Sequence, residues 1–320
     1  MQLTRRQSIR CRKNYAACVI LAVFSAQISF YQSAHAAPEA LIEDCNRVAS
    51  ATYDYDNSYS AIPDDELENS PQLIQESEEI CRRALEIDAT NARTNFQLGR
   101  ILILSGRPEE GTKFLTESAG ANYPAAQYLL GVVYHNGSLG KSDMGEAVKW
   151  WSMAAEQGHA DSQHLLGATY LLGRGVDVDL KRALDWLQKS AEQGNAGAQY
   201  LLGSMYYEGK QVPQDTTKAF QLFKNASDQG IPQAQFASGM MYLSGVGTDK
   251  NTDLGLQLLD DSASQGFPLA QLELGKVYFD GVHVEKNVAI AKRWFCKLGA
   301  FGRETYRSLS GEILQCVDHQ

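Results

Sequence analysis

The chain has 320 residues, of which 44% are hydrophobic and 21% are charged, and its formal net charge is −9. This composition is that of a folded protein, and the length allows one elongated domain or two compact ones. The negative charge argues against nucleic acid and anionic lipid as partners, because both would be repelled.

The first 36 residues have the features of a secretory signal peptide. They contain five basic and no acidic residues, and the basic residues precede an apolar run from about Ala16 to Ala26. The run is too short to span a membrane, and Ala34-His35-Ala36 has the small residues of a cleavage signature. We therefore expect cleavage after Ala36 and export to the periplasm, which leaves a mature chain of net charge −14. The segment 4–10 also resembles a twin-arginine signal, so general secretion and twin-arginine export both stay open.

Residues 37–122 are expected to form a series of N-terminal helices. A helix is predicted near 41–50, and the acidic, Tyr- and Ser-rich stretch 52–71 is predicted to be a long loop. The segment 78–111 contains Ala84-Leu85, Asn91 and Leu98-Gly99, and in these residues it resembles a tetratricopeptide unit. This resemblance implies that 37–122 form degenerate helices of the tetratricopeptide type.

Four cysteines remain after removal of residues 1–36: Cys45, Cys81, Cys296 and Cys316. An even number of cysteines in an exported chain indicates disulfides, and four cysteines allow three pairings. Since two lie near each end of the chain, we expect the pairs Cys45–Cys81 and Cys296–Cys316.

Downstream of residue 122 the sequence repeats with a period of 36 residues. The residues that recur in register are Gln127, Gln163, Gln199, Gln235 and Gln271; Gly131, Gly167, Gly203, Gly239 and Gly275; and Tyr134, Tyr170, Tyr206, Tyr242 and Tyr278. Five units without an insertion between them identify a repeat protein.

Each unit contains two amphipathic segments, for example 197–208 and 216–229, whose apolar residues follow the helical period. The glycine in the middle of the first helix is expected to let the backbone approach a bulky Trp or Phe on the second. Further glycines close the helices and are expected to adopt the left-handed cap conformation; they are Gly137, Gly173, Gly209, Gly245 and Gly281 after the first helices, and Gly158, Gly194, Gly230, Gly266 and Gly302 after the second.

The pattern A-Q-x-x-L-G-x-x-Y-x-x-G, followed by a turn and A-x-x-x-[WFL], resembles the Sel1-like repeat, a relative of the tetratricopeptide repeat. The resemblance covers about 123–302, and 198–230 is nearly a consensus unit. It implies an all-α fold, a right-handed α-solenoid of antiparallel helix pairs, followed by a capping helix and tail at 303–320. The fourth unit has Ser238 where Leu is usual and Gly255 where Ala is usual, and we expect it to pack more loosely.

Motifs of catalysis and metal binding are missing from the sequence. It contains no HExxH, Gly-x-Ser-x-Gly or P-loop motif, and its cysteines and histidines lack the spacing of zinc ligands. The glycine pairs at 173–175 and 245–247 follow helices, so they are interpreted as turns. We therefore expect no enzyme activity, no cofactor and no metal, and we assign the recurring tyrosines to core packing.

The variable positions of each first helix point away from its packed face, and stacking of units should align them along one concave wall. The residues expected on this wall are Tyr128, His135, His164, Leu171, Tyr200, Tyr207, Phe236, Leu243 and Phe279. Two interpretations remain open: the wall is a groove whose aromatic residues anchor a peptide, or the residues only fill contacts between repeats.

These features predict an exported, non-enzymatic adaptor or scaffold that binds a protein or peptide partner. The Sel1-like resemblance implies roles such as envelope signalling or regulation without naming the partner. The alternative is a cell-wall or β-lactam-binding protein with weak hydrolase activity. Related secreted proteins of that kind carry a cysteine pair in nearly every repeat, whereas residues 123–281 contain no cysteine.

Overall fold

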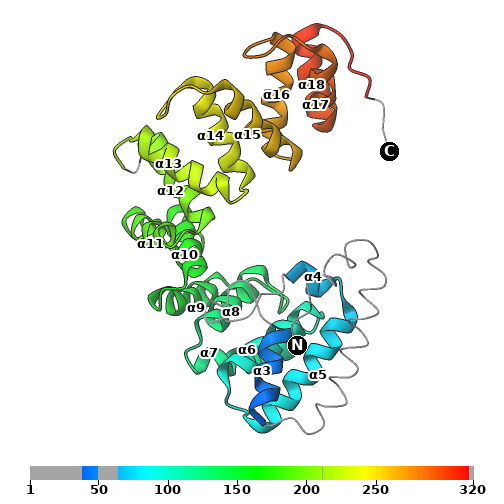
Figure 1. Ribbon diagram of the computed structural model, residues 1–320. Coiled ribbons are helices and arrows are strands. Elements are labelled where there is room, and N and C mark those ends of the chain that lie inside the picture. Colours follow the sequence, from blue (N-terminus) through cyan, green and yellow to red (C-terminus); the bar gives the residue numbers. More distant parts are fainter. Residues whose placement is uncertain (1–37, 50–63, 211, 317–320) are drawn as a thin grey trace, which may run out of the picture. The chain divides into compact units, whose positions relative to one another are not determined.

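The computed structural model describes residues 38–49, 64–210 and 212–316 (Figure 1). The predicted signal peptide and residues 50–63 therefore lie outside the described residues. Within the described residues every regular element is a helix, and none is both long and apolar enough to cross a membrane. The chain forms two compact units, residues 1–142 and 143–320, which we call unit 1 and unit 2 and describe separately. Their boundary lies inside the first 36-residue unit.

Unit 1 consists of successive helices that pack on their neighbours in the chain. The helices are α3 (Pro38–Val48), α4 (Asp64–Glu68), α5 (Pro71–Ile87), α6 (Ala92–Leu104), α7 (Pro108–Gly120) and α8 (Pro124–Asn136). The stretch 52–71, which we expected to be a loop, thus contains the short helix α4. The reason is tertiary, because the guanidinium of the buried Arg100 in α6 binds the Asp64 carboxylate at the start of α4, with Nε 2.8 Å from Oδ1.

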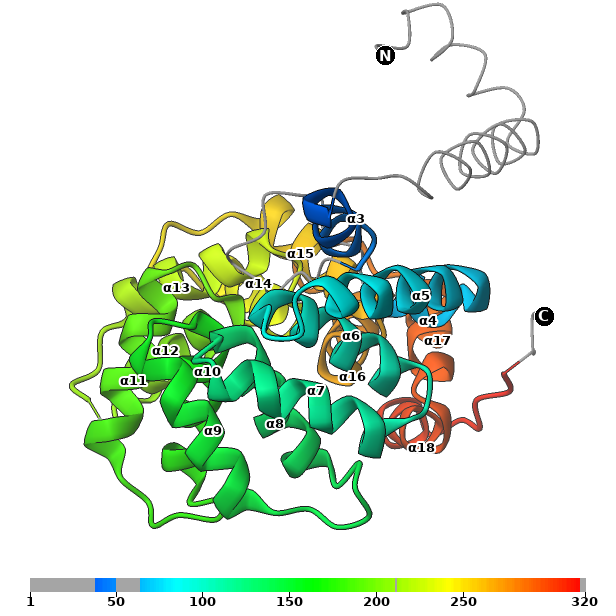
Figure 2. The ribbon, with the colours of Figure 1, turned by 90° about the horizontal axis from the view of Figure 1, so that it is seen from below.

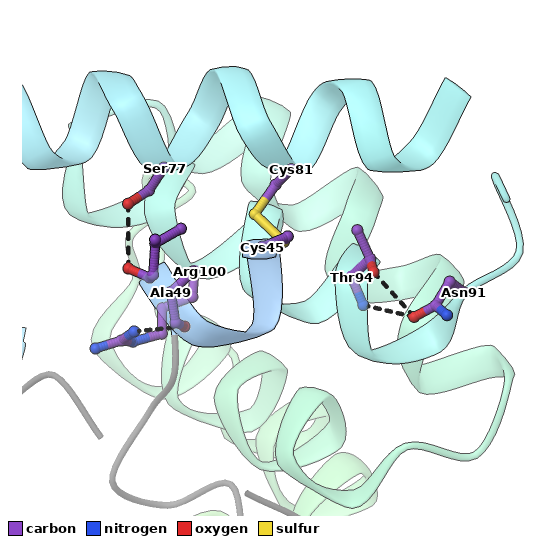
Figure 3. The surroundings of a disulfide bond; sticks show 8 residues. Cys45, Ala49, Ser77, Cys81, Asn91, Thr94 and Arg100 are labelled. Atoms are coloured by element: carbon purple, nitrogen blue, oxygen red, sulfur yellow. Dashed lines mark hydrogen bonds between the residues drawn. A yellow bond between two sulfur atoms is a disulfide. The ribbon is translucent and has the colours of Figure 1, made fainter. Parts of the chain in front are cut away.

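The end of α3 is tied to α5 and α6 by three bonds (Figure 3). The expected disulfide joins Cys45 to Cys81 with an S–S distance of 2.03 Å. Ser77 Oγ donates a hydrogen bond to the carbonyl of Val48 at 3.1 Å, and Arg100 Nη1 donates one to the carbonyl of Ala49 at 3.1 Å. These donors satisfy carbonyls that a helix end leaves without intrahelical partners.

A charged network links α5 to the start of α7 in unit 1. Glu78 accepts hydrogen bonds from Arg82 and Arg107, and Arg82 Nη2 also lies 2.5 Å from Glu110 Oε1. Burial by itself would raise the pKa of Glu78, but the hydrogen bonds and charges of Arg107 and Arg82 outweigh it, so the pKa is lowered. The network therefore keeps Glu78 ionised.

Unit 2 continues as antiparallel helix pairs (Figure 1). Its helices are α9 (Met144–Glu156), α10 (Ala160–Leu172), α11 (Leu180–Glu192), α12 (Ala196–Glu208), α13 (Thr216–Asp228), α14 (Pro232–Ser244), α15 (Thr252–Ser264), α16 (Pro268–Asp280), α17 (Val288–Lys297) and α18 (Gly299–Ser310). In Figure 2, α10 and α12 line the inner side of this stack, and α11 and α13 lie on its outer side. This arrangement confirms the expected all-α solenoid.

Local sequence signals define the helix ends of unit 2. Each second helix begins after an Asp or Asn whose side chain accepts a hydrogen bond from the backbone N–H three residues later; these caps are Asp143, Asp179, Asp215, Asn251 and Asn287. The glycines that close the first helices adopt left-handed φ values, 66° at Gly173 and 75° at Gly245, as predicted.

The mid-helix glycines lie where two helices touch. A Cβ at Gly275 would be 2.7 Å from the Phe295 ring, and one at Gly203 would be 3.0 Å from Phe223. At Gly167 the neighbour is Leu187, not an aromatic residue as we expected. The close approach is thus confirmed, but a leucine serves as well as an aromatic ring.

The recurring glutamines connect consecutive pairs by hydrogen bonds. Gln163 Nε2 in α10 donates to the carbonyl of Ala155 at the end of α9, at 3.1 Å. Gln163 Oε1 accepts from Nε2 of Gln193, the residue that caps the C-terminal end of α11, at 2.7 Å. The same side-chain pair recurs 36 residues later as Gln229 to Gln199, at 3.0 Å. One buried amide therefore joins three successive helices.

The C-terminal end of unit 2 differs from the prediction. Helix α18 begins at Gly299, and Gly302 lies inside it instead of capping the preceding helix. A Cβ at Gly302 would lie 1.9 Å from the carbonyl oxygen of Phe295, so glycine is needed for close contact between α17 and α18. The expected disulfide joins Cys296 to Cys316 and holds the tail after α18 against α17.

Candidate partner-binding surface

The candidate groove residues occupy two register positions, seven residues apart, on the first helices, and α16 carries a candidate only at the second position, Phe279. In unit 2 they lie on α10, α12, α14 and α16, and two more lie on α8 of unit 1. Seven residues are nearly two helical turns, so both positions of one helix share a face. Helices α10 and α12 also contact each other directly, which brings their faces side by side.

Helix α12 presents the most open part of this surface. Tyr207 exposes 44% of its surface, whereas Tyr200, one register position earlier, is half-buried. The rings of Tyr200 and Tyr207 lie 5.8 Å and 6.4 Å from the ring of Phe223 in α13. Both tyrosine rings therefore pack against Phe223, and the exposed part of the Tyr207 ring remains available to a partner.

Two further aromatic residues of the set are half-buried against neighbouring rings. Phe236 in α14 makes an edge-on contact with Phe267 at 5.5 Å, and Phe279 in α16 makes one with Tyr306 of α18 at 5.8 Å. Such pairs stabilise a fold beyond the area they bury. These two residues therefore fill contacts between helices and expose only part of their surface.

Leu243 belongs to the core and not to the groove, contrary to our expectation. It is 4% exposed and packs on α15 at Gly255, where a Cβ would lie 2.8 Å from its Cγ and Cδ2. Gly255 stands where the other units have alanine, and Leu243 fills the space of the missing methyl group. The fourth unit is therefore not loosely packed, since Ser238 is also fully buried and its hydroxyl donates to the carbonyl of Ala234 at 2.6 Å.

Helix α10 contributes two half-buried residues, His164 and Leu171. The His164 ring lies over Gly197, where an added Cβ would be 2.6 Å from its Cε1. Burial lowers the pKa of His164 below its ordinary value of 6.5, and the nearby Asp161 carboxylate only partly opposes this. Burial therefore favours the neutral form of His164, and Leu171 packs against the apolar cluster around Leu202.

In unit 1, Tyr128 and His135 on α8 are both half-buried. The carbonyl of His135 accepts a hydrogen bond from Ser142 Oγ at 2.7 Å, which fixes the turn after the helix.

The recurring tyrosines lie at the rim of the core. Tyr206 and Tyr242 pack against Phe220 or Phe223, and the hydroxyl of Tyr206 accepts a hydrogen bond from Lys218 Nζ at 2.7 Å. The packing role predicted for these tyrosines therefore holds, with an added polar contact at the surface.

Sequence reasoning missed a pocket in unit 2 that is lined mainly by the second helices α9 and α11. Two adjoining hollows of about 360 and 380 Å³ share Glu156 of α9 and Trp186 and Lys189 of α11. The sequence signal was present, because Trp186 replaces the leucine of the two following units, but the predicted surface was confined to the first helices. Within the described ranges no group of three or more His, Cys, Asp or Glu side chains is arranged to hold a metal ion.

Comparison with protein families and solved structures agrees with this geometry. The Sel1 repeat model matches five consecutive segments, residues 124–159, 160–195, 196–231, 232–267 and 268–299. A comparison with curated protein sequences finds no match.

Two solved structures are similar over most of the chain. The Sel1 repeat protein from Oxalobacter formigenes is 26% identical, with a TM-score of 0.63, and the match covers 72% of this chain and 96% of that protein. The protein c5321, a protective antigen of uropathogenic Escherichia coli with an SLR fold, is 25% identical, with a TM-score of 0.64. That match covers 88% of this chain and 62% of the antigen.

Proposed function

The chain belongs to the Sel1 repeat family, whose helical-repeat fold is typical of protein-interaction scaffolds, and we propose that it is an exported, non-enzymatic adaptor. Its partner is a protein or peptide that binds the surface formed by the first helices of unit 2. The observation that carries this proposal is Tyr207 of α12, a large aromatic side chain that stays 44% exposed and packs against the buried Phe223 ring. Rigid aromatic anchors of this kind supply much of the binding energy in protein interfaces.

Export to the periplasm is part of the proposal. The signal-like residues 1–36 favour it, and so do two disulfides, which persist in oxidising compartments. Fractionation of cells followed by mass spectrometry of the protein should find a mature chain that begins at Ala37. A full-length chain retained in the cytoplasm would contradict this part.

The binding surface can be tested by site-specific photocrosslinking in cells. A benzophenone amino acid at position 207 should crosslink the partner, whereas the same group at Lys181, an exposed position of α11, should not. The variant Tyr207→Ala should lower partner capture at an unchanged melting temperature. If Tyr207→Ala instead destabilises the protein as a core change does and leaves capture intact, the residues only fill contacts between helices.

A further inference from the structure

The pocket lined by α9, α10 and α11 combines aromatic rings with charged side chains. Glu156 comes from α9, Tyr170 from α10, and Asp185, Trp186 and Lys189 come from α11. The Trp186 ring is half-buried, whereas the charged side chains of Glu156, Asp185 and Lys189 are exposed. The pocket is therefore a charged site with a flat apolar floor.

The face of Trp186 already holds a cation. Lys189 Nζ lies 4.4 Å from the ring centroid, inside the range of a cation–π contact. This contact within the chain shows that a positive group finds a favourable place over this ring.

The two carboxylates of the pocket are uncommitted. Glu156 and Asp185 form no ion pair, and neither carboxylate accepts a side-chain hydrogen bond, within the part of the chain that the structure describes. The other cation of the pocket, Arg182, is already engaged, because its Nε lies 3.3 Å from Asp179 Oδ2 and its Nη1 donates to the Tyr170 hydroxyl at 3.3 Å. The pocket thus offers an aromatic face and two free negative charges, with Lys189 as the cation that a ligand would displace.

We propose that this pocket binds an arginine side chain of the partner protein. A guanidinium is planar and weakly hydrated, so it can stack on the Trp186 ring while its N–H groups reach Glu156 and Asp185. Lysine fits less well, because its ammonium is a point charge that is strongly hydrated. The net charge of −9 favours a basic segment of the partner. This inference rests on the proposed function in one respect, namely that the ligand belongs to a partner protein. The pocket itself does not include Tyr207.

The equivalent positions of the other repeats suggest a conservative substitution for each of the three pocket residues. At the equivalents of Trp186, Asp185 and Lys189 in the next unit stand Leu222, Gln221 and Asn225, and two units on, Leu258 and Gln257 repeat the first two. The variants Trp186→Leu, Asp185→Gln and Lys189→Asn therefore introduce residues that this helix type already accepts. Their fold can be checked by circular dichroism and melting temperature.

The test is a titration of the full ¹⁵N-labelled chain with the capped tripeptide acetyl-Gly-Arg-Gly-amide. The chain has four tryptophans, so Trp186→Leu identifies the indole N–H signal of Trp186 by its disappearance. The arginine probe should shift this signal saturably, and a probe with the neutral isostere citrulline should not. Asp185→Gln, which keeps the indole signal, should weaken the arginine probe about fivefold, in the range of one lost charge interaction. Lys189→Asn should tighten it, because the competing ammonium is removed.

Three results would overturn the inference: equal shifts with the arginine and citrulline probes, a stronger response to acetyl-Gly-Glu-Gly-amide, or weaker binding after Lys189→Asn. The variant Tyr207→Ala distinguishes this inference from the proposed function. It should bind the arginine probe as the unaltered chain does, even if position 207 crosslinks no partner.

Discussion

Unit 1 and unit 2 are both built from packed helices, but the bonds that connect their helices span different separations along the sequence. In unit 1, Arg100 binds a carbonyl 51 residues earlier, and the Cys45–Cys81 disulfide spans 36 residues. In unit 2, Gln163 bonds a carbonyl 8 residues earlier and an amide 30 residues later, and the pattern then repeats. Unit 1 therefore depends on a few single connections, whereas unit 2 distributes its stability over many equivalent ones, each confined to neighbouring helices.

Among the changes that test this contrast, removal of the disulfides should lower the free energy of unfolding most. Replacing Cys45 and Cys81 by alanine should lower the free energy of unfolding of unit 1 by about 4 kcal/mol, because the bond closes a long loop in the unfolded chain. Replacing Cys296 and Cys316, whose bond closes a shorter loop, should cost about 3 kcal/mol in unit 2. Hydrogen exchange of α3 and α5, compared with α17 and α18, measures both. Equal losses spread over all helices would contradict the confinement of each effect to its unit.

Replacement of the buried Arg100 in unit 1 should have the next largest effect on the free energy of unfolding. Arg100→Met removes the donor to the carbonyl of Ala49 and the partner of Asp64, and it should cost about 2 kcal/mol. Protection of α4 from hydrogen exchange should disappear first, since Asp64 is its first residue. Retained protection of α4 would show that Arg100 does not hold this helix in place.

Substitution of one glycine in each unit tests the effect of steric crowding on stability. Gly203→Ala should cost about 1 to 2 kcal/mol, because the new Cβ would meet the Phe223 ring at 3.0 Å. Gly120→Ala in α7 is the matched control, since a Cβ there meets no atom within 4 Å. It should stabilise the chain by about 0.5 kcal/mol through higher helix propensity. Chemical denaturation measures both, and a loss at Gly120 equal to that at Gly203 would remove the role assigned to the close approach.

The smallest expected effect is a pH dependence at His164. Its pKa is lowered in the folded state, so below the ordinary value of 6.5 the unfolded chain binds the proton more readily. The free energy of unfolding should therefore fall as the pH drops from 6.5 toward the folded-state pKa, and it should not change through this group above 6.5. The variant His164→Leu introduces leucine, which Leu272 provides at the same register position, and it should remove this part of the pH dependence. Urea unfolding measured between about pH 5 and pH 8, roughly the range over which histidine titrates, tests this. An unchanged pH profile would contradict the assignment.

Much of the fold follows from the sequence because its signals are local. The cap residues Asp179 and Asp215 bond backbone groups three residues away, and Gly173 turns the chain at one position, so the period of 36 residues fixes the helix ends. The disulfide pairs were also predictable, since the cysteines lie in pairs near the two ends of the chain. Helix α4 was missed, because it is placed by Arg100 from another helix.

The sequence by itself determined the repeat, the helix pairs, the face that carries the recurring Gln, Gly and Tyr, and the family. Only the tertiary structure decided which of the remaining residues stay exposed. Leu243 and Tyr207 occupy equivalent positions, yet Leu243 is buried because α15 carries a glycine opposite it, whereas Tyr207 rests on the Phe223 ring and remains 44% exposed. The Trp186 pocket likewise requires residues of α9, α10 and α11 to meet. Such outcomes depend on single atoms of neighbouring helices, which the periodicity of one helix does not specify.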